Sequence, residues 1–140
     1  MASFDGTQYA DITAGNFLNP TEIGGRVRVA YFDIPAITGL AQNDTVNLTK
    51  LPIGARVIGG RLDHGAYGAS VTLSIGYTGS TAKFLSAADI SGAGQKDLAN
   101  TLALNMGFKL TASLTIFATF AGANPSDTAV LNGYLLYVVD

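Results

Sequence analysis

The sequence predicts an all-β fold, an antiparallel two-sheet β-sandwich of jelly-roll topology with about eight strands. The dominant hydrophobic period is two residues, and clusters of Gly, Asn, Asp and Pro separate the short apolar stretches. No segment has the sustained 3.6-residue period and caps of a long helix, and the best helical candidate is one or two turns within residues 80–91. Short strands without crossover helices favour antiparallel sheets.

Two stretches alternate clearly between apolar and polar residues. In residues 70–77 (SVTLSIGY) and 110–120 (LTASLTIFATF), every second side chain is apolar, as a strand with one buried face requires. Truncating a core residue of either strand to alanine is expected to cost about 2–5 kcal/mol. The core residues expected from these strands include Leu73, Ile75, Leu114 and Ile116.

For two further stretches, the pattern does not show which face of the strand is buried. Residues 26–34 (RVRVAYFDI) change along one face from arginine to aromatic and aliphatic residues, and residues 130–139 (VLNGYLLYVV) are apolar on both faces. Each is interpreted as a buried strand or as a strand with one face in an interface. Shorter candidate strands are residues 45–51, 55–64, 82–85 and 100–106.

The first 25 residues differ from the rest. They are rich in turn residues, their aromatic residues lack periodicity, and they end in Gly24-Gly25. We expect residues 1–25 to form an extended N-terminal arm and residues 26–140 to form a single sandwich domain, since 140 residues suit one core.

Composition and charge narrow the classes of function. Only 13% of the residues are charged, against about 25% in typical domains, and 48% are hydrophobic. This indicates either a protein that functions inside an assembly or a β-domain with a Ser/Thr-rich surface. The net charge of −2 and the dispersed cations argue against direct nucleic-acid binding. No apolar run approaches the ~18 residues of a membrane span, and no signal-peptide pattern occurs, so we expect a soluble, non-secreted protein with no membrane partner.

The pair Asp63-His64 is the most site-like feature, but its context argues against catalysis. His64 is the only histidine, cysteine is absent, and no Gly-x-Ser-x-Gly motif supplies a nucleophile. Adjacent strand residues also face opposite ways. We therefore expect a surface strand end entering a turn at Gly65, with substitutions changing stability by no more than about 1 kcal/mol. No enzyme activity, metal or cofactor is expected.

The glycines do not form a phosphate-binding motif. Neither a P-loop nor a G-x-G-x-x-G pattern is present, and no helix follows the nearest match at residues 92–97 (GAGQKD). Gly59-Gly60 is interpreted as a bulge or close backbone approach, and Gly92 and Gly94 as parts of a flexible loop.

One group of turns and strands resembles a known family. The turn Leu51-Pro52-x-Gly54-Ala55, the strand RVIGGRL, the stretches SVTLSIGYTGS and KFLSAADIS, and the final LNGYLLYVVD are similar to jelly-roll cement or decoration proteins of short-tailed double-stranded DNA phages. The resemblance spans roughly residues 26–140 and is a pattern of strands and turns. It implies a structural protein made in the host cytoplasm that binds the exterior of the assembled capsid and joins neighbouring major capsid subunits.

The resemblance implies two partners: the major capsid protein, and the protein itself as a homodimer in preference to a trimer. The runner-up is a jelly-roll carbohydrate- or receptor-binding module of a virion or fibre, although the absence of tryptophan weakens it. We expect the arm and the start of the first strand to contact a neighbouring chain, because apolar arm residues gain little in water. The residues predicted to bind the partner are Phe4, Tyr9, Phe17, Leu18, Arg26 and Arg28.

Overall fold

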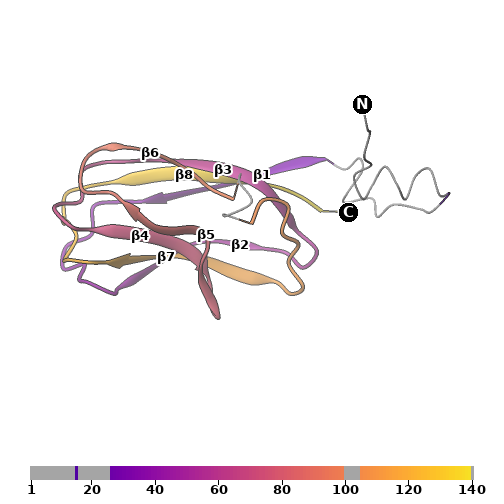
Figure 1. Cartoon of the computed structure of the whole chain (residues 1–140), viewed down its shortest axis with the longest axis horizontal. Helices are drawn as coiled ribbons and strands as arrows, with labels where there is room; N and C mark the ends of the chain where they lie inside the picture. Colours follow the sequence, from indigo (N-terminus) through magenta and orange to yellow (C-terminus); the bar gives the residue numbers. More distant parts are fainter. Residues whose placement is uncertain (1–14, 16–25, 100–104, 140) are drawn as a thin grey trace, which may run out of the picture.

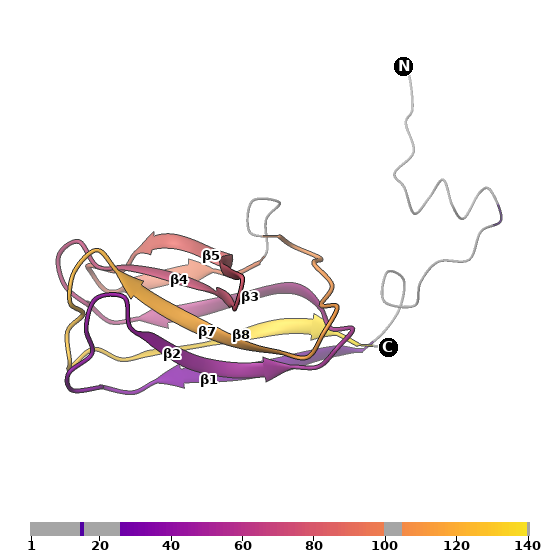
Figure 2. The same cartoon turned by 90° about the horizontal axis from the view of Figure 1, so that it is seen from below.

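The computed structural model describes Gly15, residues 26–99 and residues 105–139. The last two ranges form a two-layer β-sandwich (Figures 1 and 2). The sandwich confirms the predicted all-β class. One layer, here called the β1 sheet, has the strand order β1-β8-β3-β6, and the other, the β2 sheet, has the order β2-β7-β4-β5. The strands are β1 (Val27–Ile34), β2 (Thr45–Leu51), β3 (Arg56–His64), β4 (Thr72–Tyr77), β5 (Ser80–Asp89), β6 (Gly94–Asp97), β7 (Leu114–Ala121) and β8 (Leu131–Val138).

The strand order is that of a jelly roll. Strand β1 pairs with β8, β2 with β7, β3 with β6 and β4 with β5, and all these pairs are antiparallel. The chain is thus folded like one long hairpin whose successive strand pairs are wound alternately into the two sheets. As a result, β1 begins and β8 ends at the same end of the sandwich, on the right in Figure 1.

The core lies between the sheets, where the alternating strands point their apolar faces. Leu73, Ile75 and Ile116 are fully buried, as predicted. Leu114, the first residue of β7, is only half-buried, although it packs against the core. The predicted strand 110–120 is therefore shortened at its start, although Leu110 remains buried.

Three local predictions differ from the structure. The best helical candidate, within residues 80–91, is not a helix, because β5 occupies Ser80–Asp89 and includes the strand expected at 82–85. Residues 92–97 do not form only a loop, since Gly94 begins β6. Of the strand expected at 100–106, residues 100–104 lie outside the described part, and Asn105 and Met106 belong to a turn. The described part still has eight strands, because β6 was not among the expected strands and completes the count.

The interpretation of Gly59-Gly60 is confirmed. The register between β3 and β8 shifts between Val57 and Gly59, which is a bulge. A Cβ atom on Gly60 would also clash with the backbone carbonyl of Tyr134 on the neighbouring strand. Glycine therefore allows β3 to pass close to β8 at this point.

Candidate interaction surface

The outer face of the β1 sheet exposes an apolar stripe along its edge strand. On β1, Val27 is 54% exposed, Val29 is 43% exposed and Tyr31 is 76% exposed, whereas Phe32 and Ile34 point into the core. The half-buried Leu136 and Tyr134 of β8 pair with Val29 and Tyr31, respectively. Large apolar side chains that remain on a surface mark a place where a partner can bind.

The β1 sheet becomes polar toward its other end. Across the sheet, Asp33 pairs with Asn132, and Asn132 pairs with Asp63. On the same side Arg61 donates a hydrogen bond to Gln95 of β6. Along the strand direction, the side chains on this face therefore change from valine and leucine, through Tyr31 and Tyr134, to carboxylates and amides.

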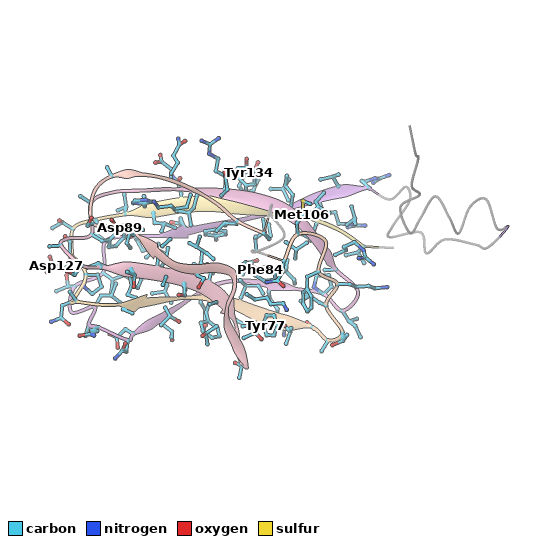
Figure 3. All side chains as sticks on the ribbon, in the orientation of Figure 1. Tyr77, Phe84, Asp89, Met106, Asp127 and Tyr134 are labelled. Carbon is cyan, nitrogen blue, oxygen red and sulfur yellow. The ribbon has the colours of Figure 1, made fainter. Side chains whose placement is uncertain are left out.

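Two hollows lie on either side of Tyr134. This side chain stands on the outer side of the sheet, while Phe84 lies between the two sheets (Figure 3). The rings of Tyr31 and Tyr134 meet edge to face, with centroids 6.3 Å apart. The larger hollow, about 450 Å³, is lined by Tyr31, Phe32, Asp33, Asn132, Gly133 and Tyr134. The smaller one, about 210 Å³, is lined by Arg61, Leu62, Asp63, Gln95, Asn132, Gly133 and Tyr134.

The predicted partner-binding residues divide into two groups. Arg26 and Arg28 are exposed at the start of β1. Both arginines lie on the same face of the strand as Phe32 and Ile34. They are at the end of the sandwich, however, where their side chains reach solvent. Phe4, Tyr9, Phe17 and Leu18 lie outside the described residues, so their role stays a prediction.

Asp63 and His64 do not form a catalytic pair. As expected, β3 ends at His64, and the two side chains face opposite ways, with Asp63 exposed. The prediction of a surface site is wrong for His64, which is only 4% exposed because it lies on the core face of β3. Its Nδ1 atom lies 2.9 Å from the carbonyl oxygen of Gly65, and its buried Nε2 atom has no hydrogen-bond partner.

Two of the described titratable groups, Tyr67 and Asp89, have shifted pKa values. Within residues 26–99 and 105–139, no group of three or more His, Asp or Glu side chains is placed to hold a metal ion. Burial raises the pKa of Tyr67 to about 12. Hydrogen bonds from the backbone and side chain of Ser91 lower the pKa of the exposed Asp89 carboxyl. No helix long and apolar enough to cross a membrane occurs in the described part of the chain.

The sequence indicated an excess of apolar residues on two segments, but it did not show that the two segments form one surface. The apolar character of both faces of residues 130–139, and the Val-x-Val-x-Tyr series in residues 27–31, indicated a buried strand or an interface. The structure pairs β1 with β8, so that both excess apolar faces lie side by side on one outer surface. Tyr31 and Tyr134 were missed as surface residues because strand pairing is not readable from either segment alone.

Solved structures of similar fold come from phage capsids. A chain in the capsid asymmetric unit of cyanophage Pam1 superimposes with a TM-score of 0.68 and 24% identity, covering 84% of this chain and 88% of that one. This chain has the fold of a phage capsid component. A chain in the capsid of Ralstonia phage GP4 gives a TM-score of 0.68 at 19% identity, covering 83% and 86% of the two chains.

A third similar chain, in the acid-stable capsid of Helicobacter pylori bacteriophage KHP30, gives a TM-score of 0.58 at 20% identity and covers 81% of this chain and 89% of that one. In all three cases the covered shares of the two chains are similar, so the matched chains are about as long as this one. No family model matches the sequence, and no curated protein matches it.

Proposed function

We propose that the protein is a structural virion component that binds the exterior of an assembled phage capsid and cements neighbouring major capsid subunits. The observation that carries this proposal is the fold likeness, over more than four fifths of both chains, to components of similar length in three phage capsids. Because a fold alone does not fix a function, the proposal also depends on the character of the surface.

The distribution of exposed apolar residues supports attachment from one side. Three of the six exposed large hydrophobic residues in the described part, Val27, Val29 and Tyr31, are neighbours on a single face, which suits a protein that attaches to a shell through one part of its surface. A subunit that itself builds a closed shell needs complementary contacts with neighbours around its whole rim. The low charged fraction of 13% agrees with a surface that is partly covered in the assembly.

Cementing follows from binding the shell more tightly than its free subunits. A ligand that binds only the assembled state stabilises that state by mass action, and contacts to two subunits at once add effective concentration. In this proposal Arg26 and Arg28 contact a neighbouring chain together with the arm residues Phe4, Tyr9, Phe17 and Leu18, and the protein acts as a homodimer in preference to a trimer. No catalytic residue takes part.

Co-sedimentation tests the proposal. The purified protein is added to capsids that lack it and, separately, to unassembled major capsid protein. We expect saturable binding to the capsids, weak binding to free subunits, and a rise in the temperature at which the capsids dissociate. Equal affinity for both forms would contradict cementing, and cryo-electron microscopy of loaded capsids that placed the sandwich inside the shell would contradict exterior attachment.

A glycan-binding module is the second candidate, favoured by the hollow between β1 and β8. Tyr31 and Tyr134 offer apolar ring faces, while Asp33 and Asn132 offer hydrogen-bonding groups for hydroxyls. A glycan array distinguishes the candidates: retention of a sugar that is lost on Tyr134→Ala substitution, without capsid binding by the native protein, would favour this second function.

A further inference from the structure

The charged side chains are segregated between the two ends of the sandwich. Strand β1 begins, β8 ends, β2 ends and β3 begins at one end, and the bridge between Arg56 and Lys109 adds the segment before β7. This end, here called the basic end, carries Arg26, Arg28, Lys50, Arg56 and Lys109. None of the acidic residues that the structure describes lies there.

The opposite end carries the acids. Strands β1, β3 and β5 finish there, and β2 and the loop before β8 begin there. Figure 3 shows Asp89 and Asp127 together at this extremity. This end, here called the acidic end, carries Asp33, Asp44, Asp63, Asp89 and Asp127, all of them exposed. Arg61, Lys96 and Asp97 lie where β3 pairs with β6, and Lys96 is near enough to Asp89 to contribute to the lowering of its pKa. Within the described residues, such segregation favours one orientation in the field of a charged partner.

The basic end also has apolar side chains that face solvent. Ile53, in the turn between β2 and β3, is 65% exposed, and Met106, in the turn that contacts β3, is 57% exposed. Val27 and Val29 are the nearest part of the apolar stripe on β1. Apolar residues mixed with cations are typical of a binding surface whose centre excludes water and whose charged rim selects the partner.

Part of the basic end is rigidly built. Arg56 donates a hydrogen bond of 2.7 Å from Nη1 to the carbonyl oxygen of Gly107, which ties the Met106 turn to the start of β3. The backbone N–H of Gly107 in turn donates to the carbonyl oxygen of Val57. These two bonds fix the turn that carries Met106 against the start of β3.

We infer that the basic end faces the capsid and docks on an acidic surface of the assembled shell, so that the acidic end points away from it. This inference rests on the proposed function and adds the orientation of the molecule and the chemistry of its partner. Charge complementarity of this kind steers association and fixes register.

Two matched variants test the inference. Lys50→Gln removes one cation from the basic end, and Lys96→Gln removes the same charge from β6, away from that end. Binding to capsids is measured by co-sedimentation from 50 to 500 mM salt, with circular dichroism to verify folding. We expect the first variant to bind about threefold more weakly at 50 mM salt and to approach the native protein at 500 mM, because surface charges are screened there. The second variant should bind like the native protein.

The other outcomes separate the remaining partners. Equal affinities and equal salt dependence of both variants would overturn the inference while leaving cementing intact, whereas failure of the native protein to bind capsids would overturn the proposed function. Residues 1–25 contain Asp5, Asp11 and Glu22. A loss of capsid binding in the first variant that occurs only after deletion of residues 2–22 would identify these acids as the native partner of the basic end and would overturn the inference. Binding to a DNA fragment as tight as binding to capsids, and lost in the first variant, would assign the surface to nucleic acid instead.

Discussion

Replacing Gly133 with alanine tests whether close strand packing holds the β1 sheet together. Gly133 lies on β8, an inner strand between β1 and β3. A Cβ atom there would lie 2.6 Å from the carbonyl oxygen of Arg61 and 2.9 Å from both Cα and Cβ of Leu62. Non-bonded carbon atoms pack best at about 3.5–4.0 Å, so β3 and β8 would have to separate by several tenths of an ångström.

The expected loss follows from two opposing effects. Overpacking of this kind costs about 1–3 kcal/mol. The smaller conformational freedom of alanine in the unfolded chain returns about 0.4–1 kcal/mol. We therefore expect Gly133→Ala to lower the free energy of unfolding by about 1–2 kcal/mol. Gly92→Ala is the matched control, because nothing lies within 4 Å of its added Cβ atom.

Urea denaturation followed by tyrosine fluorescence measures both variants, since the chain has six tyrosines and no tryptophan. The midpoint should fall for Gly133→Ala with an unchanged slope, and the control should stay within about 0.5 kcal/mol of the native protein. Equal midpoints for the two variants would refute the argument from backbone proximity.

Three further predictions concern single side chains. Ile75→Ala should cost about 2–5 kcal/mol in the same assay and Leu114→Ala clearly less, because only the first is fully buried; equal losses would contradict the core boundary. His64→Ala should cost about 2–4 kcal/mol and Asp63→Ala less than about 0.5 kcal/mol, since only His64 is buried. Burial raises the pKa of Tyr67 to about 12, from about 10 in the unfolded chain, so the unfolded chain loses this proton first as the pH rises. The contribution of Tyr67 to the free energy of unfolding is therefore fully present below pH 10 and is lost toward pH 12. The loss is at most about 2.7 kcal/mol, and Tyr67→Phe, which removes a buried hydroxyl without a partner, should abolish that part of the alkaline loss of stability.

Most strands were predictable because alternation reports local burial. The stretches that became β4 and β7 have one apolar face each, and a two-residue period is visible without knowledge of the partner strand. Strand β6 was not predictable, because GQKD has no apolar alternation and is ordered by pairing with β3. The apparent helical segment at 80–91 became β5 since pairing with β4 overrides weak local propensity.

The candidate surface was predictable only in part. An excess of apolar residues on β1 and β8 is a property of each segment, but the decision between core and surface depends on which strands become neighbours. The burial of His64 was missed for the same reason, since a strand end beside a glycine is typical of a turn, while the core here extends to the last residue of β3. The charge segregation also depends on topology, because the cations and acids are interspersed along the chain.

The place of β8 in its sheet affects how the protein is made. Strand β8, which follows the other seven described strands in the sequence, lies between β1 and β3, which are synthesised long before it. Until β8 is complete, no strand lies between β1 and β3, and pairing over such sequence distances is slow. A product that ends before β8 would leave the edges of β1 and β3 open to other chains. Only chains that contain β8 can therefore complete the sandwich, and the β1 sheet is expected to close only after β8 has been synthesised.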